Sequence, residues 1–542
     1  MVETIGKWLY KGAYGLSAIV LLFLLFLSSV PAQTQKTSTS LAALNAAAEA
    51  VKRQEFERAG ELAKTVLATE PRNAEAHITA GLAADGRGDL VSADRHFSEA
   101  IRLKPLNAAF RNNYGALLAR MGQREAAIAE FRRSINIDPA QVNARVNLAQ
   151  ILFENGTSGD LKISKELFEA ALKLKPDVEV ARAIVVISLR LRDNLQASKE
   201  HIRYRTLAEG TSQPVEQLLE LGSALLSARL FTEAIIEGES ALAIEKYNVT
   251  GLVLTARAYL GLRDIKAAGR ILEAAVAGGV GDASVFSALA DVYQAGGFIE
   301  NAIPVMRLAV EKNPKDELLK AKYGLLLMDS NAPAAAVIRL KEYCVLFPGS
   351  IPIWLALGIA QLADGKNVEA RSSFERLLLL DERSVPAMAY LATIFEDAGD
   401  FAEAVKWYRK AIAAEGDSAY LHFLLADTLA KLPISDSAEI AKHLKLAALL
   451  DPTLAGVHLA LGKLHLHENN FIAATLAFET AAKNDPLMAE AYYQLGRVLT
   501  RLKRKGEAEA AFAKHKELTQ QRAVQKETTR REYARRLANV RF

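Results

Sequence analysis

Apolar and polar residues alternate along this chain in a pattern that repeats about every 34 residues. Prolines mark the period, at Pro71, Pro105 and Pro139, again at Pro314 and Pro348, and again at Pro452 and Pro486. Within each period, two stretches with apolar residues at helical spacing are separated by a short turn. The pattern therefore predicts 14 units of two helices each between about residues 40 and 522. The expected units are 40–73, 74–107, 108–141, 142–178, 179–214, 215–248, 249–282, 283–316, 317–350, 351–384, 385–418, 419–454, 455–488 and 489–522.

Three further positions recur in these units. An alanine usually stands twelve positions before the proline position, a large residue such as Phe97 eight before it, and a small residue such as Gly81 ten after it. Two antiparallel helices approach closely only where side chains are small, and a large side chain then fills the space beside them. Proline ends the second helix because it lacks an N–H group. One hairpin leaves an apolar face uncovered, so neighbouring hairpins must stack. The pattern is weakest in the fourth and fifth units, where Val186 replaces the small residue and Glu200 the alanine.

The stretch Asn112–Pro139 (NNYGALLARMGQREAAIAEFRRSINIDP) resembles the tetratricopeptide repeat, and its pattern recurs in phase over about 480 residues. The resemblance implies an all-α, right-handed superhelical solenoid of about 14 helix-turn-helix repeats, closed by a basic C-terminal capping helix at 523–542. It also implies that the first helices of the units line a concave groove, which binds an extended peptide or a partner helix.

The N-terminal segment 1–39 has a different character. Lys7 and Lys11 precede the uncharged apolar run Leu16–Leu27, and small residues follow up to Ala32. This is the pattern of a signal peptide at 1–32, followed here by a polar linker at 33–39. An uncleaved membrane anchor is the alternative, because the apolar run can be extended almost to the length of a spanning helix. Both interpretations place the remainder outside the cytoplasm, in the periplasm or secreted.

Composition and motifs argue against catalysis. The formal charge of +4 is small for 542 residues, so nucleic acid is not an expected partner. The single cysteine, Cys344, excludes an intramolecular disulfide and is expected to be buried. No phosphate-binding glycine loop, GxSxG or HExxH motif occurs. His465 and His467 are two residues apart, whereas a helical metal pair needs spacing of four. We expect no enzyme activity, cofactor or metal.

Helical spacing selects the side chains that would face the groove. Near its start these are Asn112, Asn113, Asn147 and Gln150. Asn113 and Asn147 occupy the same position in successive units and resemble a short form of the asparagine ladder in O-linked N-acetylglucosamine transferases. The middle presents the acidic Asp291 and Asp329. The end presents a cluster of basic and aromatic residues, Lys431, Lys463, Tyr493, Arg497 and Arg501. We interpret these residues as candidate partner contacts, with the four cations forming a basic stripe for an acidic segment or a free carboxylate.

The sequence thus indicates a non-enzymatic scaffold for protein–protein interaction in a bacterial-type cell envelope. Two alternatives stay open. One is a membrane-anchored assembly factor for envelope complexes, associated with the membrane through its N-terminus. The other is a substrate-recognition module for a separate enzyme. Neither the partner nor the oligomeric state follows from the sequence.

Overall fold

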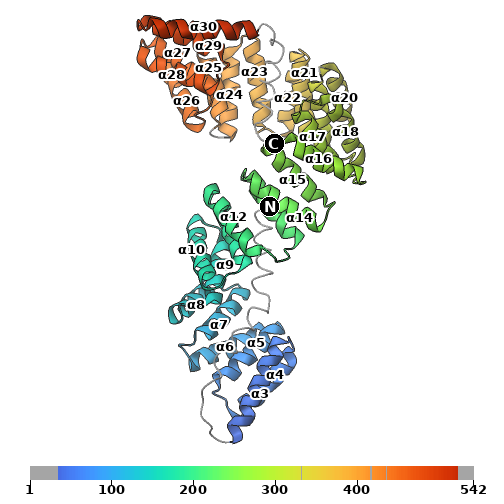
Figure 1. Cartoon of the computed structure of the whole chain (residues 1–542), viewed down its shortest axis with the longest axis vertical. Helices are drawn as coiled ribbons and strands as arrows, with labels where there is room; N and C mark the ends of the chain where they lie inside the picture. The colour runs from blue at the N-terminus through green and yellow to red at the C-terminus, as the bar shows by residue number, and fades with distance from the viewer. Residues whose placement is uncertain (1–34, 331, 416–417, 435, 523–542) are drawn as a thin grey trace. The chain divides into compact units, whose positions relative to one another are not determined.

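A computed structural model of the chain describes residues 35–330, 332–415, 418–434 and 436–522 (Figure 1). These residues form 28 α-helices, labelled α3 to α30, and no strand. The predicted fold class, an all-α array of helical hairpins, is confirmed. The predicted signal peptide and C-terminal capping helix lie outside the described residues. Within the described ranges, no helix is long and apolar enough to cross a membrane.

The helices pair in chain order, so that each odd-numbered helix and the next even-numbered one form a hairpin. The first seven hairpins contain α3 (Gln35–Lys52), α4 (Phe56–Thr69), α5 (Ala74–Gly86), α6 (Leu90–Leu103), α7 (Ala108–Arg120), α8 (Arg124–Ile137), α9 (Val142–Asn155), α10 (Ser158–Leu174), α11 (Val178–Arg190), α12 (Asn194–Ala208), α13 (Val215–Ser227), α14 (Phe231–Ile244), α15 (Val249–Gly261) and α16 (Ile265–Ala277).

The other seven contain α17 (Ala283–Ala295), α18 (Ile299–Lys312), α19 (Glu317–Asp329), α20 (Pro333–Leu346), α21 (Ile351–Ala363), α22 (Asn367–Leu380), α23 (Val385–Asp397), α24 (Phe401–Glu415), α25 (Ala419–Leu429), α26 (Ser437–Leu450), α27 (Ala455–His467), α28 (Phe471–Asn484), α29 (Ala489–Arg501) and α30 (Lys505–Arg522). We call the odd-numbered member of each hairpin its first helix and the even-numbered member its second helix.

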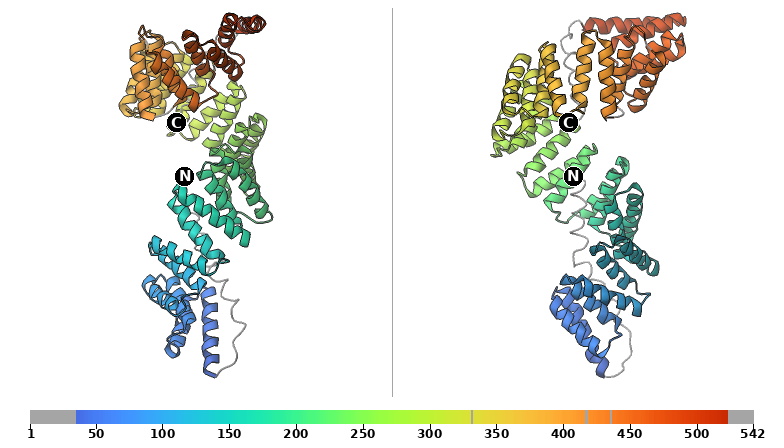
Figure 2. Two further views of the ribbon diagram at one scale, coloured as in Figure 1. Left: turned by 90° about the vertical axis from the view of Figure 1, so that its left-hand side faces the viewer. Right: turned by 180° about the vertical axis from the view of Figure 1, so that it is seen from behind.

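The chain divides into two compact halves, the N-terminal half ending at Ala268 and the C-terminal half beginning at Gly269. Within each half, successive hairpins stack side by side, as the two further views in Figure 2 also show. The largest apolar core of the C-terminal half runs from α19 to α27 and includes Phe374, Tyr390 and Tyr408. Phe374 on α22 stacks on Tyr390 of the next hairpin with ring centroids 5.0 Å apart. The large residue thus links neighbouring hairpins as well as the helices of its own.

Small and large residues face each other inside the hairpins, as the sequence pattern required. A Cβ atom placed on Gly81 would lie 2.6 Å from Phe97, and one on Gly358 would lie 2.5 Å from Phe374. The same clash would arise at Gly115, Gly324, Gly462 and Gly496, each time with the large residue of the same hairpin. The recurrent alanines, for example Ala302, are fully buried. Close helix approach therefore explains both residue choices.

Polar residues at fixed positions start the helices. Two residues after Pro71, the side chain of Asn73 accepts a hydrogen bond from the amide of Ala76 at the start of α5. Asn107, Asn248 and Asp316 cap α7, α15 and α19 in the same way. These side chains satisfy amides that have no partner within the helix.

In twelve of the fourteen hairpins, the described part of the turn contains a residue in the left-handed backbone region. Six of the twelve described turns of this kind use glycine, for example Gly88, Gly122 and Gly297. The other six place a residue with a Cβ atom there, namely Gln54, Arg192, Arg229, Arg263, Asn469 and Lys503. Since the left-handed region is unfavourable for such residues, the turns differ in backbone strain.

Candidate functional site

Polar side chains on the first helices join neighbouring hairpins to each other, and they include most of the candidate groove residues. The amide of Asn147 on α9 donates to Asn112 Oδ1 on α7 at 3.0 Å, and Asn112 is 7% exposed. Gln294 on α17 donates to Asp329 on α19 at 2.6 Å. Each of these contacts joins residues 35 positions apart, so the period of the sequence becomes a series of equivalent contacts in space.

Other members of this series are ion pairs. Arg120 on α7 pairs with Asp85 on α5, and Lys431 pairs with Glu396 on α23, at the same sequence separation as the amide contacts. Lys322 Nζ lies 2.8 Å from Asp291 Oδ2. We call the contacts Asp85–Arg120, Asn112–Asn147, Asp291–Lys322, Gln294–Asp329 and Glu396–Lys431 the first-helix polar seam. The sequence analysis missed Arg120 and Asp85, although comparison of successive units at this separation would have revealed them.

The remaining predicted residues near the start of the groove differ in how accessible they are to a binding partner. Gln150 is 1% exposed and donates to Glu154 Oε1 at 3.1 Å, within its own helix. Burial raises the pKa of Glu154, which the hydrogen bond from Gln150 partly offsets. Asn113 on α7 is half-buried. Gln150 is therefore part of the packed interior, whereas Asn113 and Asn147 remain partly open to solvent.

The four cations proposed as a basic stripe have different surroundings. Lys431 lies between two carboxylates, those of Glu396 and Asp427, the latter at 2.7 Å. Lys463 Nζ on α27 lies 2.8 Å from Glu490 Oε1 on α29. Both lysine charges are thus balanced locally, which the sequence analysis did not foresee.

Arg497 and Arg501 on α29 instead lie against aromatic rings. The Arg497 guanidinium is 5.8 Å from the ring centroid of Tyr493 and donates to Gln494, and the Arg501 guanidinium is 5.5 Å from the ring centroid of Phe471. Among the described residues, neither arginine forms an ion pair. Tyr493 is 41% exposed, the only tyrosine of a described first helix with so open a side chain. We call Tyr493, Arg497 and Arg501 the α29 cluster.

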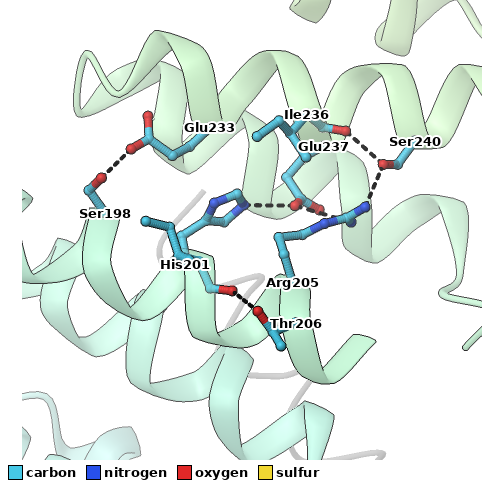
Figure 3. Close-up of polar contacts among 9 residues, drawn as sticks. Ser198, His201, Arg205, Thr206, Glu233, Ile236, Glu237 and Ser240 are labelled. Carbon is cyan, nitrogen blue, oxygen red and sulfur yellow. Dashed lines mark hydrogen bonds and ion pairs between the residues drawn. The ribbon is translucent and has the colours of Figure 1, made fainter. Parts of the chain in front are cut away.

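A second polar cluster is buried between two second helices of the N-terminal half (Figure 3). His201 Nε2 on α12 lies 2.8 Å from Glu237 Oε1 on α14, and Arg205 approaches the same oxygen at 3.4 Å. His201 and Glu237 are 1% and 0% exposed. Arg205 also donates to Ser240 at 3.0 Å. Long polar side chains therefore connect α12 to α14 where the repeat pattern is irregular.

This buried cluster also contains polar groups without hydrogen bonds. Glu237 Oε2 and the Tyr204 hydroxyl are buried and have no partner among the described residues. Burial, and then the nearby charge of Glu237, raises the pKa of Tyr204 to about 12. The sequence signal for the cluster is Gly238, which occupies the position where other hairpins have a large residue. His201 and Glu237 are shielded from solvent, and their contacts hold α12 against α14.

The single thiol offers no reactive group. Cys344 is 6% exposed, and burial raises its pKa to about 12. Since only the thiolate is a good nucleophile, this cysteine is an apolar packing residue.

Comparisons with known proteins agree with the repeat pattern. A family model described as tetratricopeptide repeat matches residues 78–142, 355–420, 395–442 and 459–523. A TPR repeat-containing protein of Pseudomonas aeruginosa is 31% identical over 109 residues, which are 20% of this chain and 43% of that protein. The TPR repeat-containing protein YpiA of Bacillus subtilis is 27% identical over 148 residues, 27% of this chain and 35% of the relative. The chain thus spans less than half the length of these curated relatives.

Solved structures with a similar fold include Cut9 in its complex with Hcn1, from the APC/C, at 14% identity and a TM-score of 0.38. That match covers 86% of this chain and 99% of the other. PilF of Pseudomonas aeruginosa matches at 19% identity and a TM-score of 0.35, over 40% of this chain and 97% of its own.

Proposed function

Because the chain belongs to the tetratricopeptide repeat family, we propose that it is a non-enzymatic scaffold that binds an extended protein segment along its first helices. Two points support binding through the first helices: in proteins of this family these helices line a concave groove, and here successive first helices such as α3 and α5 lie in contact. The polar seam adds amide and charged groups on or next to several first helices, which suits an extended backbone with polar groups of its own.

The observation that carries this proposal is the α29 cluster. Among the described residues, no carboxylate pairs with Arg497 or Arg501, and the other side chains of their helix are largely buried. Tyr493 exposes an aromatic surface beside them. Tyrosine and arginine are the residue types that contribute most strongly to protein interfaces. An acidic segment or a chain-terminal carboxylate complements this cluster, since arginine binds carboxylates through two parallel hydrogen bonds.

We also propose that the scaffold acts in the cell envelope. This part depends on the N-terminal sequence pattern alone, in which lysines precede an apolar run and small residues follow it. Cleavage after Ala32 gives a periplasmic or secreted scaffold, whereas retention of the segment gives the membrane-anchored assembly factor. Sequencing the N-terminus of the mature protein from its host distinguishes the two, and recovery of the full-length chain in the cytoplasm would contradict both.

The groove is tested with acidic peptides that end in a free carboxylate, by measuring their affinity for the full chain. We expect the double variant Lys463→Glu, Arg497→Glu to lose at least tenfold in affinity, and added salt to weaken binding to the native chain. The matched control is Lys445→Glu with Lys483→Glu, which changes the net charge equally on the exposed faces of α26 and α28. Equal affinity in the native chain and the Lys463, Arg497 variant, with helicity intact, would contradict the proposed site.

A further inference from the structure

Two pairs of histidines face each other across hairpins in the two halves of the chain. His77 Nδ1 on α5 lies 3.1 Å from His96 Nδ1 on α6. His422 Nδ1 on α25 lies 2.9 Å from His443 Nδ1 on α26. The first member of each pair stands six residues after the proline position, and the second stands nine residues before the next one. Histidines at the same two positions of the repeat therefore bring their Nδ1 atoms close together in both hairpins.

Second contacts orient one ring of each pair. The Nε2–H group of His77 donates to the carbonyl oxygen of Pro71 at 3.0 Å. A neutral His77 then presents the lone pair of Nδ1 to its partner. In the other pair, His443 Nε2 lies 3.9 Å from Glu439 Oε1, beyond hydrogen-bond distance, and the charge of this carboxylate favours a proton on Nε2 and a lone pair on Nδ1. A backbone carbonyl or a carboxylate in this position is the usual companion of a histidine that binds a metal ion.

We propose that each histidine pair is a binding site for a divalent transition-metal ion of the Cu²⁺ or Ni²⁺ type. Two imidazole nitrogens that are each about 2.0–2.1 Å from an ion and at right angles to one another lie about 2.9 Å apart. The observed separations of 3.1 and 2.9 Å match this arrangement. Binding then requires the proton on the second ring to move from Nδ1 to Nε2, which changes the tautomer and releases no proton. On His422 this Nε2 is buried, so the shift there takes place inside the hairpin.

Water completes the coordination. In the described part of the chain, no group of three or more histidine, cysteine, aspartate or glutamate residues is placed to hold a metal, so each pair supplies two nitrogens. Imidazole suits copper and nickel, and a tetragonal set of two nitrogens and two water oxygens is a geometry that both ions accept.

Solvent reaches the first pair through a hollow of about 470 Å³ between α4, α5 and α6. His96 lines this hollow together with the carboxylates Glu57 and Glu61, which attract cations, and the basic Lys64 and Arg87. The Arg87 guanidinium, which also lines the hollow, donates a hydrogen bond to the carbonyl of Phe56 at 3.1 Å. In the second pair, the side chain of His443 is 15% exposed, whereas His422 is buried, so an ion would enter from the His443 side.

The test is a calorimetric titration of the untagged full chain with Ni²⁺, and separately with Cu²⁺, after removal of metals with a chelator. We expect two ions per chain for the native protein, one for His96→Gln, one for His443→Gln and none above background for the double variant. The control is His458→Gln. His458 occupies the same repeat position as His77 and bonds the carbonyl of Pro452 at 2.8 Å, but the position facing it holds Ala477. This variant should retain two ions.

Electron paramagnetic resonance of the Cu²⁺-loaded native chain provides a readout that does not depend on the variants, and should show two nitrogen ligands per ion. Native protein that binds no more metal than the double variant would overturn the proposal, as would a His458→Gln loss equal to that of His96→Gln. If the native chain binds one ion and His96→Gln binds none, the site assigned to His422 and His443 would be overturned. Circular dichroism establishes that each variant is folded.

Discussion

Trp354 donates its indole N–H to the carbonyl oxygen of Pro348, six residues earlier, at 3.0 Å. The same contact recurs after other prolines of the period: His77 donates to Pro71, Arg111 to Pro105, Arg145 to Pro139, Lys320 to Pro314 and His458 to Pro452. The proline carbonyl lies between two helices, where the backbone provides no regular partner. A nitrogen donor in the first helix satisfies it, whatever the type of side chain.

Replacing Trp354 with phenylalanine should therefore destabilise the adjoining hairpins by about 0.5–1.5 kcal/mol, because the hydrogen bond is lost while a smaller aromatic side chain remains. The measurement is amide hydrogen exchange at the start of α21, since coupling between neighbouring repeats makes a single global midpoint hard to interpret. Trp407→Phe is the control, because Trp407 lies under Lys410 and bonds no proline carbonyl among the described residues. Equal exchange in the two variants would contradict the capping role.

Gly358→Ala tests the close approach of α21 and α22. Alanine is favoured over glycine in a helix by about 1 kcal/mol. Its Cβ atom would nevertheless lie 2.5 Å from Phe374 Cε1, and overpacking costs about 1–3 kcal/mol. We expect a net loss of stability in denaturant unfolding. Gly349→Ala is the control, since a Cβ atom there meets nothing within 4 Å. A stabilised Gly358→Ala variant would show that the two helices separate without cost.

The buried cluster of Figure 3 should respond strongly to the loss of one partner. His201→Leu removes one of the two groups that contact Glu237, which is 0% exposed, and leaves Arg205, 3.4 Å from Glu237 Oε1, as the remaining partner. Breaking a buried pair costs about 3–5 kcal/mol. Adding Glu237→Leu should recover most of this loss, because the poorly compensated carboxylate is then gone. Exchange protection of α12 and α14 reports both effects, and Glu239→Leu on the exposed side of α14 is the control. A double variant as unstable as His201→Leu would contradict the electrostatic explanation.

The histidine pairs predict a loss of stability in acid when no metal is bound. Burial, followed by the charge of the neighbouring histidine, lowers the pKa of both His96 and His443. The folded chain then binds fewer protons than the unfolded chain, so stability is complete above the ordinary histidine pKa of about 6.5 and falls as the pH drops below it. Melting in the presence of a chelator at pH 7.5 and 5.5 measures the effect. The difference should shrink in His96→Gln with His443→Gln, and should not shrink in His467→Gln.

The sequence was sufficient for the hairpins but not for the charges on them. Gly358 and Phe374 occupy fixed positions of a recurring pattern, and close packing permits few alternatives at such positions. Lys463 lies on the first helix α27, whereas Lys431 lies in the turn after α25. The carboxylate partners of both lysines depend on which way long side chains turn, and the period does not fix this. The histidine pairs were missed because only spacings within one helix were considered. Aligning the units shows His77 with His422 and His96 with His443.

The uneven distribution of left-handed turns has a mechanical consequence. Hairpins turned by glycine, such as those at Gly365 and Gly399, store no Cβ strain there, whereas those at Arg229 and Arg263 do. If a scaffold of this kind is stretched between two anchored partners, each released repeat yields at most roughly 110–120 Å of extended chain. Since each hairpin is held by its neighbours alone, hairpins with a Cβ-bearing residue in a left-handed turn, such as those at Arg229 and Arg263, would unfold before hairpins turned by glycine. The array would then lengthen in steps under a pulling force, and the hairpins that stay folded would remain bound to their partners.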